Sequence, residues 1–494
     1  MAILLKNATL LTMDNQRPIL ERQLLVVDKG LIATIGKGIR PGRFDITEQI
    51  DCSGKIVIPG LVNTHSHLTE ILQKGFRDNV RMEVWREYRM LTEEMANLGP
   101  AEISAAAKLA CGEMLKSGVT AVVDHFSTRA GPNMENMYAI ITAFEETGIR
   151  GVLAPSLRDQ DPLRLVRSRP QNMKASKKRT EEPWQGKLIA ILQEIKQSSG
   201  ISDVMLGPSN PLNCSDLLLR EIVKMADQYG VGIHTHFLET RLQRWVANRQ
   251  YGRRLGERLD KLGFLSPRLS AAHCIWLQEK EIDLMASRGC SVVHNPASNL
   301  KLGSGIAPVI ELKKHGINVA LGTDGGDTSD TYSIFEQIRL AAFLSRLTAE
   351  NPSDWLTAWD VLAMGTVNGG QAVPSWRGKI GKIKKGYRAD LLIIKPSLRL
   401  YPLNEIVHQL VFCEGGHSVD TVLVDGEVVV RQGYLTRVNE EALIRDVEPI
   451  SKEMYRIYNQ IKRRSLQARS TIHRLYQKAS RTKMPLTINP KLSP

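Results

Sequence analysis

"KIVIPGLVNTHSH", residues 55–67, is an apolar, partly β-branched run that ends in two histidines one residue apart, His65 and His67. The composition of this run predicts a buried β-strand. Alternate side chains of a strand point to the same face, so both imidazoles would converge on one point. That arrangement suits a metal ion, although two partly buried histidines could also share a polar pocket. The rest of the chain has to decide between these two interpretations.

Seven further strand-like stretches follow this one, and helix candidates such as "SDLLLREIVKMADQYG" separate them. The seven are VTAVVDH (119–125), IRGVLAPSL (149–157), DVMLGPSNP (203–211), VGIHTHFLE (231–239), LSAAHC (269–274), CSVVHNP (290–296) and NVALGTDGG (318–326). Strands that alternate with helices imply parallel β-α units. Eight such units predict an α/β fold, a closed TIM-like (β/α)₈ barrel. A doubly wound open sheet is the alternative.

Both ends of the chain differ from this middle part, because they contain short strand-like segments with Gly and Asp turns, such as "AILLKNATLLTM". Neither group is long enough to form a stable sheet alone. We therefore expect residues 1–58 and 376–440 to form one composite β-sandwich beside a barrel of residues 59–375. Residues 441–494 would form a basic helical tail, and residues 158–184 a long loop on the active face of the barrel.

Composition places the chain among intracellular proteins. It has 494 residues, 42% of them hydrophobic, and no apolar run that approaches the roughly 18 residues of a membrane span. The first residues lack the features of a secretory signal. Six scattered cysteines without a C-x-x-C pair predict reduced thiols. We therefore expect a cytoplasmic protein with no membrane partner.

The net charge of +14 lies mostly in the last residues, since 451–494 contain 11 basic residues and one acidic residue. Such a tail could bind nucleic acid or an anionic surface. However, it offers only Tyr455, Tyr458 and Tyr476, at helical spacing, instead of an interleaved stacking platform. We therefore expect a solvated helix with a frayed end, and no nucleic-acid partner.

The ends of the predicted strands carry the residues that suggest chemistry. Working residues of such barrels lie at the carboxyl ends of the strands. Histidines or acids occur there on four separate strands, which core packing does not explain: His65 and His67, then His234, His236 and Glu239, then His273, and finally Asp324. A metal centre on this rim is therefore predicted.

These motifs together resemble the amidohydrolase superfamily over essentially the whole chain. "PGLVNTHSH", "HTHFLET", "AHC", "HNPASNLKLGSGIAPV" and "GTDG" are similar, in the same order, to those of its branch of cytosine, guanine and thioadenosine/S-adenosylhomocysteine deaminases and triazine hydrolases. The resemblance implies that the metal ligands are His65, His67, His236 and Asp324. Three imidazoles and a carboxylate suit one Zn²⁺, with Fe²⁺ as second choice.

The resemblance also implies the roles of the remaining catalytic groups. Asp324 and His273 would hold and deprotonate a water molecule that the cation acidifies. Glu239 would protonate a ring nitrogen and then help ammonia depart. Strand four ends in "LGPSNP" without the modified lysine of the paired-metal members, which argues for a single metal and against ring-opening enzymes.

Other polar residues near the strand ends are predicted to be structural or to contact the substrate. We expect His234 and His294 to be structural, and Asp327 and Asp330 to organise the loop after strand eight through backbone hydrogen bonds. Four residues are tentative substrate contacts: Trp85, His125, Arg158 and Ser209. Ser209 stands in "GPSNP" where thioadenosine-type deaminases carry "GPHSP", and "GTDGGDTSD" departs from their Ser-Asn-Asn ending. Both departures argue against an adenosine-like substrate.

The sequence thus predicts a metal-dependent aminohydrolase that deaminates a purine, a pyrimidine or a related ring. The alternative is a triazine-type hydrolase that releases an alkylamine or chloride. A non-catalytic metal-binding scaffold is the distant alternative, because a structural zinc site would close its coordination without Glu239 and His273. A homodimer is expected from the resemblance alone.

Overall fold

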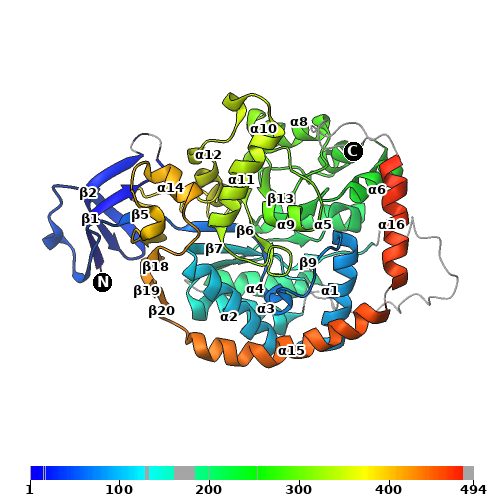
Figure 1. The fold of residues 1–494 in the computed structure, drawn as a ribbon, viewed down its shortest axis with the longest axis horizontal. Coiled ribbons are helices and arrows are strands. Elements are labelled where there is room, and N and C mark those ends of the chain that lie inside the picture. The colour runs from blue at the N-terminus through cyan, green and yellow to red at the C-terminus, as the bar shows by residue number, and fades with distance from the viewer. Residues whose placement is uncertain are drawn as a thin grey trace.

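The computed structural model describes residues 2–14, 16, 18–127, 133–160, 184–197, 200–252, 254–464 and 466–481. A strand-rich unit built from both ends of the chain stands beside a larger body of strands and helices (Figure 1). Most of the loop expected at 158–184, and residues 482–494 of the tail, lie outside the described residues. No described helix is long and apolar enough to span a bilayer.

The strands of the two ends pair in one nine-stranded sheet. Its order is β20 (Tyr434–Leu435), β19 (Glu427–Arg431), β18 (Val419–Val424), β17 (Leu391–Ile394), β5 (Ile56–Pro59), β1 (Ala2–Leu11), β2 (Ile19–Asp28) and β3 (Leu31–Gly36), with β4 (Ile46–Asp51) on β1. The two ends meet where β17 pairs antiparallel with β5, Leu392 opposite Ile58. The predicted union of the termini is therefore present as a sheet, whereas the two-layer sandwich stays a prediction.

The middle of the chain contains a strand in each of the eight predicted stretches, and every pair among them is parallel. One sheet runs in the order β10 (Ser202–Val204), β8 (Arg150–Leu153), β7 (Val119–Asp124), β6 (Leu61–His67), β16 (Asp324–Gly325). A second runs β12 (Ile233–Phe237), β13 (Leu269–His273), β14 (Ser291–His294), β15 (Asn318–Leu321), and β9 (Ser156–Leu157) pairs with β11 (Gly207–Pro208). The fold is therefore α/β.

Helices lie between these strands and after the last of them. They are α1 (Met82–Ala96), α2 (Pro100–Lys116), α3 (Met134–Thr147), α4 (Trp184–Gln197), α5 (Asp216–Tyr229), α6 (Arg241–Tyr251), α7 (Leu255–Lys261), α8 (Glu279–Ser287), α9 (Pro296–Lys301), α10 (Val309–Lys314), α11 (Ile334–Thr348), α12 (Ala358–Met364), α13 (Val367–Ala372) and α14 (Ile406–Phe412). Helix α5 shows why: the Ser215 hydroxyl accepts a hydrogen bond from Leu218 N, and Gly230 ends the helix at a φ of +69°.

The basic tail is not a solvated helix, and this prediction was wrong. It forms α15 (Glu440–Arg464), which runs along one side of the body, and α16 (Leu466–Arg481), which turns at its far end (Figure 1). One face of each helix is buried, through Met454, Tyr458, Leu475 and Tyr476. The high charge of the tail sequence concealed this packing, because basic side chains such as Lys452, Arg456 and Lys478 are exposed on the other face of these amphipathic helices.

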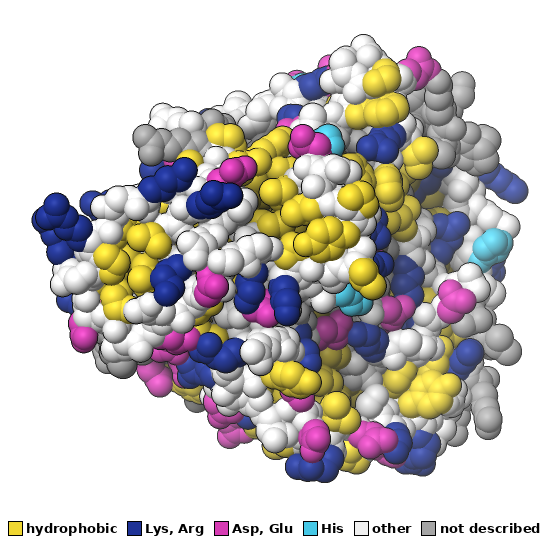
Figure 2. Space-filling model, turned by 60° about the vertical axis from the view of Figure 1, so that its left-hand side comes forward, with side chains coloured by type: hydrophobic (Ala, Val, Ile, Leu, Met, Phe, Trp, Pro, Cys, Tyr) yellow, Lys and Arg dark blue, Asp and Glu magenta, His cyan; other side chains and the backbone are white. Residues whose placement is uncertain are grey.

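Charge on the molecular surface is mixed. On the face drawn in Figure 2, basic side chains are scattered among acidic and hydrophobic ones. This face therefore lacks the clustered basic patch that nucleic-acid binding usually requires.

Candidate metal centre and active site

Four side chains from three strand ends converge in the centre of the strand assembly. Nε2 of His67 lies 3.1 Å from Nε2 of His236. Oδ1 of Asp324 lies 3.4 Å from Nε2 of His65 and 3.3 Å from Nε2 of His67. One ligand atom from each of the four residues lies within 4.8 Å of all the others. The parallel strands β6, β12 and β16 thus bring distant parts of the chain to one point.

The donor atoms fit a divalent metal ion. Bonds of the length usual for zinc and imidazole place tetrahedral ligand atoms about 3.3 Å apart, close to the separations above. Nε2 of His65 is buried and has no hydrogen-bond partner among the described residues. An unpartnered buried nitrogen is costly unless a ligand satisfies it. Three nitrogens and one carboxylate oxygen form a donor set that Zn²⁺ favours.

A second set of hydrogen bonds orients the three imidazoles. Nδ1–H of His67 donates to the carbonyl of His125 at 2.6 Å, and Nδ1–H of His236 donates to the carbonyl of Ser209 at 2.7 Å. Nδ1 of His65 lies 2.8 Å from Nε2 of His234. Each bond leaves Nε2 of the ligand facing the cluster. His234 is therefore more than the core histidine expected from the sequence, because it holds a cluster residue.

Asp324 occupies a constrained position. Its φ is +64°, in the left-handed region, which a non-glycine residue rarely adopts without support from its surroundings. The Ser298 hydroxyl donates to Oδ2 at 2.5 Å, and the main-chain N–H of Gly325 donates to Oδ1 at 2.9 Å. A Cβ atom at Gly325 would overlap the Glu70 carboxylate, so this position requires glycine.

His273 points its free nitrogen toward the same carboxylate. Its Nδ1–H donates to Oδ1 of Asn299 at 2.9 Å, while Nε2 lies 3.9 Å from Oδ2 of Asp324 and has no hydrogen-bond partner among the described residues. The backbone of His273 also lies in the left-handed region, at a φ of +71°. Sequence reasoning missed the supporting roles of Ser298 and Asn299, although both belong to the quoted motif "HNPASNLK".

Burial sets the charge of the cluster. It lowers the pKa of the His65 side chain, and holds the pKa values of His67 and His236 well below the usual range. These imidazoles are therefore neutral, as ligands must be. Burial acts to raise the pKa of Asp324, but the close approach of the His65, His273 and His67 imidazoles outweighs it, so the pKa is lowered and the carboxylate is ionised.

Glu239 lies two residues beyond the end of β12 and is only 5% exposed. Burial raises the pKa of its carboxyl group to about 7. The Ser304 hydroxyl donates to its Oε1 at 3.1 Å, and its main-chain N–H donates to Oε1 of Gln243 at 2.8 Å. A carboxyl group with a pKa near neutrality can donate a proton at physiological pH.

A cavity of about 90 Å³ opens beside the cluster. His236 and Glu239 line it, together with Trp85, Arg158 and Ser209, three of the four residues expected to contact a substrate. The structure places the fourth, His125, differently: it is fully buried, and its Nε2 lies 3.2 Å from the carbonyl of Gly207. His125 thus orients His67 through its main-chain carbonyl, and its side chain does not line the cavity.

In the loop after Asp324, Asp330 makes the expected hydrogen bond to the backbone, whereas the Asp327 carboxylate binds side chains instead. Oδ2 of Asp327 accepts from Trp85 Nε1 at 2.8 Å and from Arg77 Nη1 at 2.6 Å. Oδ1 of Asp330 accepts from the main-chain N–H of Gly75 at 3.1 Å. Asp327 therefore fixes the Trp85 ring at the edge of the cavity.

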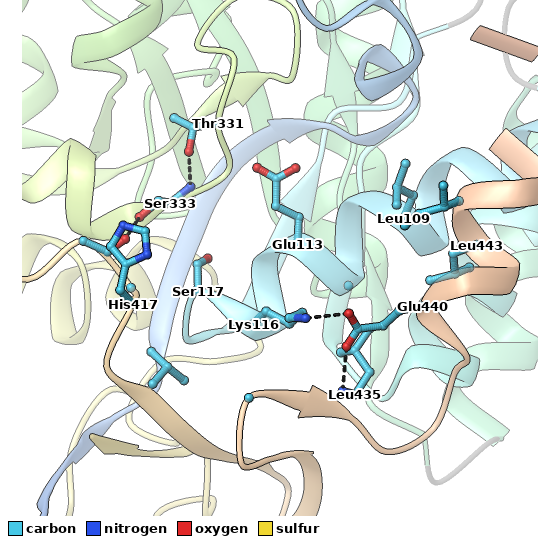
Figure 3. Close-up of a pocket in the computed structure, with 16 residues that line it drawn as sticks. Leu109, Glu113, Lys116, Ser117, Thr331, Ser333, His417, Leu435, Glu440 and Leu443 are labelled. Carbon is cyan, nitrogen blue, oxygen red and sulfur yellow. Dashed lines mark hydrogen bonds and ion pairs between the residues drawn. The ribbon is translucent and has the colours of Figure 1, made fainter. Parts of the chain in front are cut away.

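A larger cavity of about 550 Å³ lies elsewhere, between α2, α15 and the end of the terminal sheet (Figure 3). Its charged groups are already paired: Lys116 with Glu440 at 2.5 Å, and Glu113 with Lys74 at 2.8 Å. None of the predicted site residues lines it. The predicted site residues therefore gather at the smaller cavity, not at this one.

Comparisons with known proteins agree with this geometry. The amidohydrolase family model matches residues 56–429. A 5'-deoxyadenosine deaminase from Methanosarcina mazei is 33% identical over 455 residues, which cover 92% of this chain and 98% of that protein. An adenosine deaminase from Xanthomonas campestris with bound zinc superposes with a TM-score of 0.80, at 27% identity, over 92% of this chain and 98% of its own. A zinc complex of atrazine chlorohydrolase from Arthrobacter aurescens superposes with a TM-score of 0.81, at 26% identity, over 91% and 100%.

Proposed function

We propose, from the premise that this chain belongs to the amidohydrolase family, that it is a metal-dependent deaminase. It would hydrolyse the bond between a ring carbon and an exocyclic amino group of a nitrogen heterocycle. The observation that carries the proposal is that a metal-competent cluster, a buried acid and an imidazole with a free nitrogen meet at one cavity. A structural metal site would need neither of the last two groups.

The ligands in this proposal are His65, His67, His236 and Asp324, and the ion is Zn²⁺. When bound, the ion would supply Lewis acidity and lower the pKa of a water molecule. Nε2 of His273 and the Asp324 carboxylate lie where they can hold that water and accept its proton. The imidazole can take up the proton because Nδ1–H is already committed to Asn299.

Glu239 supplies the proton that the leaving group requires. In its protonated form it would donate to the ring nitrogen next to the carbon under attack, which removes the negative charge that would otherwise build up on the ring. As a carboxylate it would then take the remaining proton of the hydroxyl group now on the carbon and pass it to the amino nitrogen. The water oxygen would remain on the carbon as a carbonyl, and the amino nitrogen would leave as ammonia. The raised pKa supports this role, because an acid with an ordinary glutamate pKa would be ionised at pH 7.

For the substrate we propose an aminated purine of the adenosine type. Support comes from the curated relative from Methanosarcina mazei, named a 5'-deoxyadenosine deaminase, which matches nearly the whole chain. The proposal runs against the two sequence departures noted above. Ser209 binds His236 through its carbonyl and offers only a short hydroxyl to the cavity, so the ring would be contacted differently here than by a histidine.

A triazine-type hydrolase is the second candidate. The similarity to the atrazine chlorohydrolase structure favours it, because that similarity covers 91% of this chain. The two candidates differ in the leaving group, which is ammonia for a deaminase and chloride or an alkylamine for the alternative.

We also infer that the parallel strands close into a (β/α)₈ barrel. An isolated parallel bridge joins Leu206, just after β10, to Ile233 of β12. At the other end, β15 lies against β6, and β16, which pairs with β6, begins only three residues after β15 ends. A closed barrel would explain why the carboxyl ends of first and last strands share one site.

The decisive experiment measures product release from a panel of amino-purines, amino-pyrimidines and chloro- or amino-triazines by the zinc-loaded protein. Adenosine and 5'-deoxyadenosine belong to the panel, and Glu239→Gln is the control. We expect ammonia from a purine with the wild type and none with the variant. Chloride or alkylamine release alone would establish the second candidate. No product from any ring, with one zinc bound per chain, would overturn both.

A further inference from the structure

The C-terminal helix α16 brings one buried hydroxyl group to α1, a helix that lines the active-site cavity. Tyr476 is 8% exposed, and its hydroxyl lies 2.9 Å from Oε2 and 3.1 Å from Oε1 of Glu83. Glu83 is 5% exposed and belongs to the first turn of α1. The helix that carries the tyrosine lies almost at the other end of the chain, so nothing local in the sequence brings these two side chains together.

The same carboxylate is tied to the segment that bears Glu239. The Thr240 hydroxyl donates to Oε1 of Glu83 at 2.7 Å. Thr240 is also the N-cap of α6, since its side chain accepts from Gln243 N at 3.2 Å. The Gln243 side chain in turn accepts the main-chain N–H of Glu239. A continuous chain of hydrogen bonds therefore runs from Tyr476 to the backbone of the proposed proton donor.

Glu83 is buried enough to need both hydroxyl donors. Burial raises the pKa of its carboxyl group, and the hydrogen bonds from Thr240 and Tyr476 act in the opposite direction. Removal of one donor leaves a buried carboxylate partly unsatisfied, which favours a shift of the side chain or of its neighbours. The neighbour bonded to the same carboxylate is Thr240, at the start of α6 and next to Glu239, so a shift of Glu83 would displace that segment.

Docking of α16 does not depend on this hydroxyl alone. Ile472, Leu475 and Ala479 pack in one apolar cluster with residues of α1 and α6, among them Val84, Leu242 and Trp245. The Arg81 guanidinium lies 4.3 Å above the Tyr476 ring. A phenylalanine at position 476 keeps the ring and these contacts, so Tyr476→Phe removes the hydrogen bonds to Glu83 without undocking the helix.

We propose that Tyr476 is a positioning residue for the proton donor of the active site, and that the C-terminal helix is a structural part of that site. It acts through Glu83 and Thr240 on the geometry of Glu239. The inference rests on the proposed function for its catalytic readout, but its structural readout does not depend on that function.

The first test compares Tyr476→Phe with Tyr455→Phe, which makes the same change on an α15 side chain that is 49% exposed. With the best substrate of the panel, we expect Tyr476→Phe to lower kcat about tenfold, because a slightly displaced general acid loses part of its contribution to the rate. KM should change less than about twofold, because the variant displaces the acid and leaves the contacts that bind the substrate unchanged. Bound zinc should be unchanged, and Tyr455→Phe should match the wild type.

Thr240 provides the matching test in the same chain of hydrogen bonds. Thr240→Val should reproduce the loss in kcat and Thr240→Ser, which keeps the hydroxyl, should restore it. The double variant Tyr476→Phe/Thr240→Val should lose less than the product of the two single losses, since both act through Glu83. Independent, multiplicative losses, or a Tyr476→Phe variant with wild-type kcat, would overturn the proposal.

Hydrogen–deuterium exchange separates a failure of this inference from a failure of the proposed function. Tyr476→Phe should speed amide exchange over residues 239–246, and Tyr455→Phe should not. This result is expected even if the wild type deaminates nothing in the panel. Unchanged exchange in that segment would refute the coupling whatever the activity of the wild type.

Discussion

Nδ1 of His65 and Nε2 of His234 are hydrogen-bonded at 2.8 Å in the fully buried interior of the strand assembly. Nδ1 of His234 continues to the Ser270 hydroxyl at 3.2 Å. For Nε2 of His65 to bind a cation, Nδ1 must carry the proton and donate to His234. The pair therefore fixes the tautomer of a ligand, a role that a carboxylate or a carbonyl more often fills.

Loss of this pair should weaken metal binding. We expect His234→Gln to lower zinc affinity by about 10- to 100-fold, as for other residues that orient a metal ligand. Competition with a chromogenic chelator measures the affinity. His294→Gln is the matched control, because His294 is equally buried on β14 but is not part of the cluster. Equal affinities of the two variants would contradict the role of His234.

Activity should be lost as pH rises through the pKa of Glu239. Burial raises this pKa to about 7, and the proton donor must be protonated to act. The value of kcat/KM should therefore be highest below pH 7 and should decline above it, which gives the pH profile a descending limb. Glu239→Gln should lower kcat by about 10²- to 10⁴-fold and remove that limb. A limb that persists in the variant would belong to another group.

Removal of the divalent ion should reduce both activity and stability. A strong chelator is expected to abolish ammonia release, and added Zn²⁺ to restore it. Since the ion binds only the folded chain, free zinc at about 100 times its Kd would add about 2.7 kcal/mol to the free energy of unfolding. Thermal unfolding with and without zinc measures this gain in stability. Identical Tm values in the two samples would exclude tight binding at the cluster.

A buried ion pair should anchor the terminal sheet to the strand assembly. The Arg150 guanidinium binds Asp390 through two bonds of 2.8 and 3.0 Å, and Asp425 at 3.0 Å. Arg150→Ala leaves Asp390 buried without its cation, so we expect a loss of about 3–5 kcal/mol in the free energy of unfolding. Arg268→Ala removes a pair with the exposed Asp227 and should change it by less than about 1 kcal/mol. Denaturant titration of both variants compares the losses.

Much of the candidate site could be predicted because its polar side chains lie at the ends of strands. The metal-competent side chains of β6, β12 and β16 lie where parallel strands terminate, so their order along the chain sufficed to place them on one edge. The supporting residues could not be placed in the same way. Ser298 and Asn299 act from α9, whose orientation over the cluster depends on packing and not on strand period.

By itself, the sequence determined the alternation of strands and helices, the set of metal-competent side chains and the family to which the chain belongs. Local propensity and hydrophobic period encode the alternation of strands and helices. The other two features come from short motifs such as "PGLVNTHSH" and "GTDG" and their order along the chain. Only the tertiary structure decided that His234 holds His65, that His125 lies behind the cavity, and that Tyr476 reaches Glu83. Each of these depends on contacts between segments far apart in the chain, whose pairing is set by the shapes of complete helices and sheets.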